Sequence, residues 1–196
     1  MTGGSPDYAK KIPTDEMSDH ELVRLAQRGH EASFHELVTR HQKVLFGLAF
    51  SLTGNLTDAE DLLQDTLLAA FEGLRRFEGR STVKTWLSRI LMNKSAKRHQ
   101  YNSVREIVKI GPAAEAILQG TPVPSSHCAD EVRLDVAAML QRLSADHRAV
   151  LVLREIQGLS YDEIAKVLEV PVGTVESRLF RARQELRERL RSYLPG

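Results

Sequence analysis

The stretch of sequence that decides the fold is residues 160–183, SYDEIAKVLEVPVGTVESRLFRAR. Its apolar residues recur at the positions that lock two crossing helices together, with a tight turn between the helices. These residues are Ile164, Leu168, Val170, Val175 and Leu179. Ser160 and Glu163 predict a capping box at the start of the first helix. Ala165 is small enough for a close helix crossing, and Pro171 suits the start of the second helix. The pattern predicts a helix-turn-helix, which places its second helix in the major groove of DNA.

The second predicted helix leaves several side chains pointing outward, where they can contact duplex DNA. They are Thr174, Glu176, Ser177, Arg178, Phe180, Arg181 and Arg183. An ordinary helical hairpin with a solvated arginine face is the alternative, and the match between apolar spacing and turn disfavours it. Glu169 departs from the usual motif, because glycine commonly supplies the left-handed backbone at this turn position. A non-glycine residue there costs roughly 1 kcal/mol, which a packed motif can absorb.

The composition is that of a soluble globular protein that stays inside the cell. Hydrophobic residues make up 42% of the chain and charged residues 27%, both ordinary values for such proteins. The formal net charge is only +1, so nucleic-acid binding has to rest on how charge is distributed. The single cysteine, Cys128, excludes an intramolecular disulfide and fits a reducing cytoplasm. No segment is apolar enough for a secretory signal or a membrane span, so we expect a cytoplasmic protein without membrane insertion.

The chain predicts an all-α protein of two small helical domains, because apolar residues recur at helical spacing and no sustained alternation occurs. Residues 1–17 are polar and predict a disordered tail. Residues 18–101 predict the first domain, and residues 130–194 predict the second, which carries the helix-turn-helix. Residues 102–129 are rich in Gly, Pro and Ser, so we expect them to form a flexible linker.

Start and stop signals divide the first domain into helices. Ser18 with Glu21 predicts one capping box, and Thr57 with Glu60 predicts another after a stop signal at residues 53–55. We expect the helix that starts there to bury Leu63, Leu67, Ala70, Phe71 and Leu74.

The sign of the charge changes abruptly along the first domain. Four carboxylates predict an acidic stripe opposite the Leu63, Leu67 and Phe71 stripe, namely Asp58, Asp61, Asp65 and Glu72. Seven Lys or Arg residues and no carboxylate then follow: Arg80, Lys84, Arg89, Lys94, Lys97, Arg98 and Arg105. With Trp86 and Tyr101 interleaved, this run fits backbone tracking and base stacking on single-stranded DNA. A solvated helix face is the alternative for the acidic stripe, and a place in the core is the alternative for Trp86.

Three segments follow one another along the chain: DAEDLLQDTLLAAF (58–71), FEGRSTVKTWLSRILMN (77–93) and VPVGTVESRLFRAR (170–183). Together they resemble the extracytoplasmic-function (ECF) sigma factors of bacterial RNA polymerase. The resemblance implies a stress-response factor that binds core RNA polymerase, recognises −10 and −35 promoter elements and promotes DNA melting for transcription initiation. It implies no catalysis and no cofactor, and it suggests an anti-sigma factor as a further partner.

The resemblance also implies a role for each region. Residues 58–71 would dock on the clamp helices of core polymerase through Asp58, Asp61, Leu62, Gln64 and Asp65. Residues 77–82 and the following helix would hold the melted −10 strand through Arg80, Ser81, Lys84, Trp86, Arg89, Asn93 and Lys97. Asn93 has the donor and acceptor to read the Watson–Crick edge of a flipped base. The outward residues of the last predicted helix would read the −35 element.

Glu176 allows two interpretations. Similar factors often carry Lys or Arg at this place, so the carboxylate is unusual. It could accept a hydrogen bond from cytosine N4 in the major groove. It could instead complement the positive N-terminal end of its own helix.

Two other classes of function compete with a sigma factor. A free-standing helix-turn-helix regulator would leave the acidic stripe and the basic run unexplained. An enzyme has little support, because the chain has no HExxH, CxxC or phosphate-loop motif. His127 and Cys128 are adjacent but have no further ligands nearby, so we expect no metal site.

Overall fold

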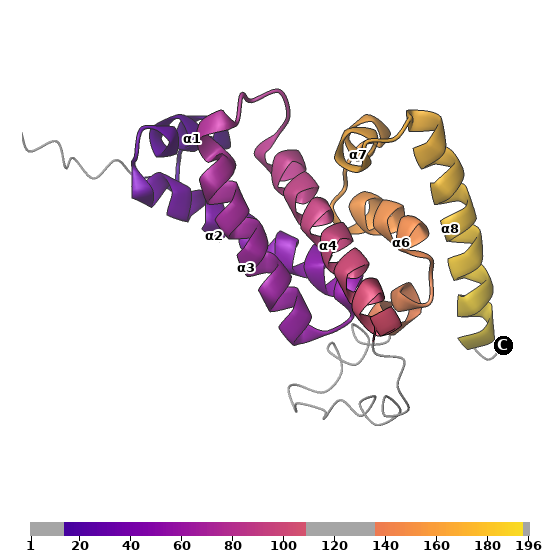
Figure 1. Cartoon of the computed structure of the whole chain (residues 1–196). Coiled ribbons are helices and arrows are strands. Elements are labelled where there is room, and N and C mark those ends of the chain that lie inside the picture. Colours follow the sequence, from indigo (N-terminus) through magenta and orange to yellow (C-terminus); the bar gives the residue numbers. More distant parts are fainter. Residues whose placement is uncertain (1–13, 109–135, 194–196) are drawn as a thin grey trace, which may run out of the picture.

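The computed structural model describes residues 14–108 and 136–193, and within these ranges every regular element is a helix (Figure 1). This confirms the predicted all-α class. The N-terminal unit contains α1 (Asp19–Gln27), α2 (Glu31–Thr53), α3 (Leu56–Gly73), the 3-10 turn η1 (Leu74–Arg76) and α4 (Val83–Val108). The C-terminal unit contains a helical segment at residues 136–141, α6 (Ala145–Leu151), the π-helical turn η2 (Val152–Ile156), α7 (Tyr161–Leu168) and α8 (Val172–Tyr193).

Polar side chains and a glycine set the ends of the first helices. The predicted capping box at α1 is confirmed, because the Ser18 N–H donates to the Glu21 carboxylate at 2.8 Å. Hydrogen bonds from the Ser18 hydroxyl and N–H hold the pKa of the Glu21 carboxyl below its usual range. α2 ends at the predicted stop, where Gly54 adopts the left-handed conformation with φ 70°.

The predicted Thr57 cap of α3 is wrong. The Asn55 side chain accepts the Asp58 N–H at 3.1 Å and caps the helix instead. α3 therefore starts at Leu56, and Thr57 lies inside its first turn. Asn and Thr are both favoured as N-cap residues, and Asn55 precedes Thr57 along the chain, so the helix begins after Asn55.

α3 buries only part of the face that its apolar residues predict: Ala70 and the following Leu74 are buried as expected, and the other predicted residues are more exposed. Its buried residues are Ala59, Leu62, Thr66 and Ala70, which face α2 and α4. Leu63 and Leu67 are half-buried, and Phe71 is 56% exposed with its ring edge-on to Phe34. Small side chains at three of the four buried positions allow neighbouring helices to approach closely, and this selects the face.

The helix-turn-helix has the predicted geometry. The Ser160–Glu163 capping box starts α7, and Glu169 takes the left-handed conformation at φ 55° and ψ 43°. The Pro171 carbonyl accepts hydrogen bonds from the Thr174 and Val175 N–H groups in the first turn of α8, so this proline directly precedes the helix. Ile164, Val175 and Leu179 are almost completely buried, whereas Leu168 and Val170 are partly buried against the same core. Ala165 is also buried between α7 and its neighbours.

The predicted borders of the tail and linker differ from the structure where residues are described. Arg40 donates to the backbone carbonyls of Thr14, Asp15 and Met17, so residues 14–17 are held against α2. α4 continues past residue 101 to Val108. The remaining tail and linker predictions concern residues 1–13 and 109–135, including Cys128, and lie outside the described residues.

The two units pack against each other, with α4 lying beside α7 (Figure 1) and α2 contacting α6 and η2. Among the described residues, four side chains donate hydrogen bonds across the boundary, and buried apolar residues of both units form one continuous cluster. The donors are Thr85 to the Glu163 carboxylate at 2.8 Å, Gln141 to the Ser51 carbonyl at 3.1 Å, Arg148 to the Leu52 carbonyl at 2.8 Å and Gln157 to the Val44 carbonyl at 2.9 Å. The sequence had suggested two domains held together by a linker alone.

Arg148 joins the C-terminal end of α2 to the segment at residues 136–141. Its guanidinium donates to four carbonyls, those of Leu52, Leu140, Gln141 and Leu143, at 2.8–3.1 Å. A cation is favourable where helices end, because the last carbonyls carry partial negative charge. Burial lowers the pKa of the guanidinium from its ordinary value, which still leaves it charged.

Replacing Arg148 with alanine is expected to destabilise the fold by about 2–4 kcal/mol, because four carbonyls lose a charged donor. Urea unfolding followed by circular dichroism measures this loss. Arg142→Ala is the control, since Arg142 is exposed and exposed substitutions usually change stability by less than about 0.5 kcal/mol. Equal stability of the two variants would show that the carbonyls find other donors.

Candidate polymerase and DNA interfaces

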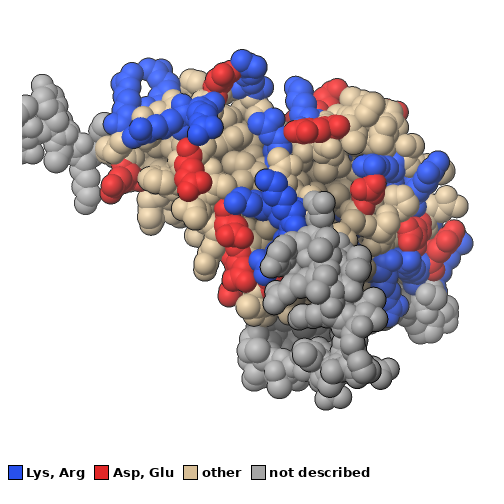
Figure 2. Space-filling model, viewed as in Figure 1, with Lys and Arg blue, Asp and Glu red and all other residues tan. Residues whose placement is uncertain are grey.

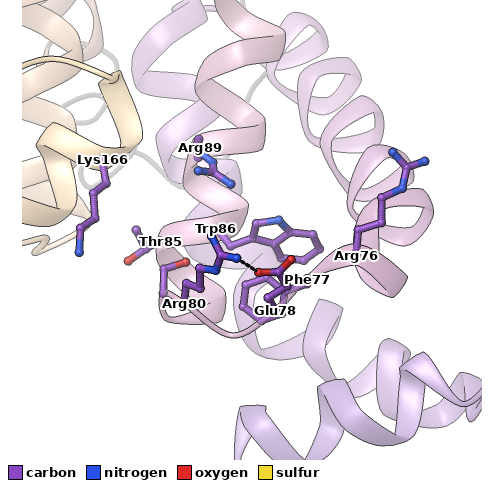
Figure 3. Close-up of a pocket in the computed structure, with 9 residues that line it drawn as sticks. Arg76, Phe77, Glu78, Arg80, Thr85, Trp86, Arg89 and Lys166 are labelled. Atoms are coloured by element: carbon purple, nitrogen blue, oxygen red, sulfur yellow. Dashed lines mark ion pairs between the residues drawn. The ribbon is translucent and has the colours of Figure 1, made fainter.

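A hollow of about 460 Å³ opens where the loop of residues 77–82 meets the first turns of α4 (Figure 3). We call it the loop hollow. Four residues predicted to bind −10 DNA line it: Arg80, Ser81, Trp86 and Arg89. Arg80 also forms an ion pair with Glu78, drawn as a dashed line in Figure 3. The loop hollow thus combines guanidinium groups, a hydroxyl and an aromatic edge, the groups that suit one nucleotide.

Trp86 belongs mainly to the core. Its side chain is only 8% exposed, and its ring lies 4.7 Å from that of Phe77. Gly73 packs closely against the ring, because a Cβ added to Gly73 would lie only 3.6 Å from a ring carbon of Trp86. Most of the Trp86 ring is therefore part of the core, as the alternative interpretation states, while one edge of the ring still lines the loop hollow.

The C-terminal unit covers one side of the loop hollow. Lys166 of α7 lines it from that side, as Figure 3 shows. Next to it, the Thr85 hydroxyl donates to Glu163 at 2.8 Å, and half-buried Lys84 lies close enough to attract the same carboxylate. The Ser160 N–H, more than these neighbours, holds the pKa of the Glu163 carboxyl below its usual range. The ionised Glu163 therefore lies beside α4, at a place where the basic residues of α4 could otherwise contact phosphate.

Asn93 and Lys97 are exposed on α4, one turn and two turns after Arg89. Asn93 lines a second hollow of about 580 Å³ between α4, α6 and α7, and not the loop hollow. The structure therefore groups the seven predicted −10 residues only in part. Arg80, Ser81, Trp86 and Arg89 share one hollow, while the others continue along α4.

The predicted polymerase contacts all lie on α3, and all but one of them reach the surface. Asp61, Gln64 and Asp65 are exposed, and Asp58 is partly exposed. Leu62 is only 1% exposed and packs in the core, so assigning it to a contact surface was wrong. It lies on the face that α3 turns towards α2 and α4.

The exposed face of α3 also contains apolar residues that sequence reasoning missed. Leu68 is 60% exposed, and helical spacing puts it two turns from Asp61 and one turn from Gln64. We call Asp61, Gln64, Asp65 and Leu68 the docking face. Its spacing of i, i+3, i+4 and i+7 was visible in the sequence, but Leu68 was not assigned to any surface. Arg98 of α4 borders the face and contacts Asp58 at 2.7 Å and Asp61 at 3.2 Å.

α8 presents most of the predicted −35 residues to solvent. Glu176, Ser177, Arg181 and Arg183 are exposed, and Phe180 is 70% exposed. Thr174 and Arg178 are half-buried. Two of the arginines are held by acids of the same unit, Arg178 by Asp146 at 2.6 Å and Arg183 by Glu155 at 2.7 Å. The hollow beside Glu176 and Phe180 adds Gln184 and Arg187, which the sequence analysis did not include.

Charges of both signs share the visible face of the molecule, as Figure 2 shows. This agrees with a net charge of only +1. Any nucleic-acid surface on this chain is therefore local, made by particular helices and not by the overall field.

Comparison with known proteins places both units in one family. Residues 37–103 match the model of sigma-70 region 2, and residues 133–186 match that of sigma-70 region 4. The RNA polymerase sigma-H factor of Pseudomonas aeruginosa is 35% identical over 185 residues, covering 90% of this chain and 95% of its own. The ECF RNA polymerase sigma-E factor of Escherichia coli is 32% identical, covering 88% and 94%. The chain belongs to the ECF family of RNA polymerase sigma factors.

Solved structures agree with this assignment. CnrH in complex with the cytosolic domain of CnrY is 32% identical, covers 89% of this sigma factor and 97% of its own chain, and has a TM-score of 0.67. The sigma factor RpoE in complex with the anti-sigma factor NepR from Bartonella quintana is 30% identical, covers 81% and 96%, and has a TM-score of 0.70. As a sigma factor, the chain recognises promoters and directs RNA polymerase to initiate transcription.

Within the described residues, no helix is long and apolar enough to cross a membrane. The same residues contain no cluster of three or more His, Cys, Asp or Glu side chains suited to a metal ion.

Proposed function

We propose that this sigma factor uses three separate surfaces in initiation. The docking face of α3 contacts core polymerase, the loop hollow and α4 hold the melted −10 strand, and the outward face of α8 reads the −35 element. The loop hollow carries the proposal, because it brings Arg80, Ser81, Trp86 and Arg89 together around a space of nucleotide size. Run-off transcription with purified core polymerase on genomic fragments tests the function as a whole.

Melting needs no hydrolysis under this proposal. A flipped base that enters the loop hollow exchanges its stacking and pairing for contacts with the protein. Arg80 and Arg89 can neutralise phosphates on either side of the base, and the edge of Trp86 can contact its face. Binding to the single-stranded form then offsets the cost of unpairing. We also propose that the factor works in the cytoplasm by binding alone, without catalysis.

Arg80→Ala with Arg89→Ala is expected to lower open-complex formation about 10-fold to 100-fold while leaving holoenzyme assembly unchanged, because two phosphate contacts are lost. Permanganate reactivity of −10 thymines measures opening, and gel filtration measures assembly. Arg75→Ala is the matched control, since Arg75 is exposed near the loop but does not line the hollow. Restoration of wild-type rates on a template with a pre-melted −10 element would limit the role of these arginines to melting. An undiminished permanganate signal on duplex promoter would remove the loop hollow from the mechanism.

The packed arrangement of the two units has to open for both promoter elements to be engaged. Elements centred near −10 and −35 are about 25 base pairs apart, which is about 85 Å of duplex. A compact chain of 196 residues has a radius of gyration of about 16 Å, so its diameter is about half that separation. We propose that core polymerase separates the units and holds each on its element.

An anti-sigma factor is the partner that we propose for the packed form. Two similar sigma factors were solved in complex with regulators, CnrH with the cytosolic domain of CnrY and RpoE with the anti-sigma factor NepR. Affinity capture of the tagged sigma factor from its own cells, compared across growth conditions, tests this partnership. Recovery of core polymerase subunits alone under every condition would indicate control by expression.

A further inference from the structure

Glu176 is an exposed carboxylate in the second turn of α8, well before the other carboxylates of this helix, Glu185 and Glu188. Its neighbours Val175 and Leu179 are buried and fix the orientation of α8, so Glu176 faces away from the core. Among the described residues its carboxylate has no hydrogen bond or ion pair. Arg178 and Arg183 differ in this respect, because each is paired with an acid of its own unit.

Two structural uses of Glu176 do not fit its position. α8 begins at Val172, and the dipole effect on a charge fades beyond the first turn, so Glu176 is too far along to cap the helix. The residues one turn away are Val172, Gly173, Leu179 and Phe180, none of which is a cation. The helix therefore gains little from this carboxylate.

On a DNA-binding face an unpaired carboxylate weakens binding, because it repels phosphate. It can offset this only by accepting a hydrogen bond from a base edge. In the major groove the available donors are the amino groups of cytosine and adenine. Adenine presents its N7 acceptor beside the amino group and would repel the second carboxylate oxygen. Cytosine presents the amino group without an adjacent acceptor, so it is the base that a carboxylate selects.

We propose that Glu176 determines specificity for one cytosine in the −35 element. This inference rests on the proposed role of α8 in −35 recognition. The hollow shared by Glu176, Phe180, Arg183 and Arg187 gives the carboxylate an open approach to the groove. Arg187, exposed on the same side of the helix, can hold phosphate close while Glu176 contacts the base, whereas Arg183 is already paired with Glu155.

Selection from a randomised −35 library with the complete holoenzyme tests the proposal. The wild-type factor should enrich cytosine at one position about fivefold or more. Glu176→Ala should remove the preference at that position and leave the other positions unchanged. Glu176→Gln should shift the preference at the same position towards adenine, because a Gln side chain pairs with both N6 and N7.

Glu188→Ala is the matched control, an exposed glutamate three turns further along α8. Its −35 profile should equal that of the wild type. Identical profiles for wild type and Glu176→Ala would overturn the proposal, as would a uniform gain of affinity over all sequences, which indicates phosphate repulsion alone. If the wild-type holoenzyme enriches no −35 sequence at all, the proposed role of α8 fails and not only that of Glu176.

Discussion

Replacing both Asp61 and Asp65 with lysine is expected to abolish assembly of the holoenzyme, weakening binding to core polymerase at least about 100-fold. Both side chains are exposed on the docking face. Reversing two charges turns attraction to a basic partner into repulsion, and such juxtapositions cost several kcal/mol in an interface. Native gel electrophoresis or gel filtration with purified core polymerase measures assembly.

The double substitution should leave the fold nearly intact. Asp65 has no ion pair among the described residues, and the contact of Asp61 with Arg98 at 3.2 Å is longer than that of Asp58 at 2.7 Å. Exposed pairs of this kind contribute about 0–1 kcal/mol. The melting temperature of the free chain should therefore fall by only a few degrees.

The effect of the net charge has to be separated from the effect of where the substituted residues lie. Each Asp→Lys change adds two charges, so the double variant has a formal net charge of +1 + 4 = +5. Glu31→Lys with Glu188→Lys reaches the same net charge from exposed positions on α2 and α8, and it should still assemble. Leu68→Ala tests the apolar part of the docking face and should weaken assembly without changing charge. A holoenzyme formed normally by the Asp61 and Asp65 variant would show that α3 does not face the polymerase.

Local sequence signals predicted the helices of this sigma factor well. The Ser18 and Ser160 capping boxes, the Gly54 stop and the left-handed Glu169 depend on neighbours within a few residues. These features require only short-range hydrogen bonds and backbone preferences, so the sequence contains all the information they need. The helix-turn-helix followed from the same kind of signal.

Features that depend on distant residues were predicted less well. Leu62 and Phe71 were assigned to the wrong faces of α3, because apolar type alone does not indicate which face the small residues select for close packing. Asn93 was grouped with Arg80, although the loop and α4 place them at different hollows. The contact of Thr85 with Glu163 joins residues 78 positions apart, a pairing that a single sequence does not show.

The packing of the two units also predicts a large effect on DNA binding by the free chain. The isolated sigma factor should bind promoter duplex at least about 100-fold more weakly than the holoenzyme does. In the described part of the chain, four hydrogen bonds and a shared apolar cluster hold the units together, and α7 covers one side of the loop hollow. Separating the two units loses these contacts. We expect binding to the rigid polymerase scaffold to supply the free energy of separation and to position both units at once.

Fluorescence anisotropy with a promoter duplex measures the two affinities, and energy transfer measures the opening. Dyes on Gln42→Cys and Glu188→Cys, in a chain with Cys128→Ser, label exposed sites of the two units. Transfer should be high in the free chain and fall when core polymerase is added. Thr85→Val with Gln141→Ala removes two of the crossing hydrogen bonds. Each is worth about 1 kcal/mol, so this variant should populate the open form about tenfold or more over the wild type.

Two results would contradict this picture in different ways. Unchanged energy transfer on binding core polymerase would mean that the units stay packed, and the two promoter elements could not be spanned by this chain. Tight, sequence-specific binding of duplex by the free chain would instead favour a helix-turn-helix regulator that acts unaided. The energy-transfer readout and the affinity readout are independent, because the first reports on distance between the units and the second on DNA alone. Loss of transfer together with gain of specific binding, both requiring core polymerase, is the outcome that the crossing contacts lead us to expect.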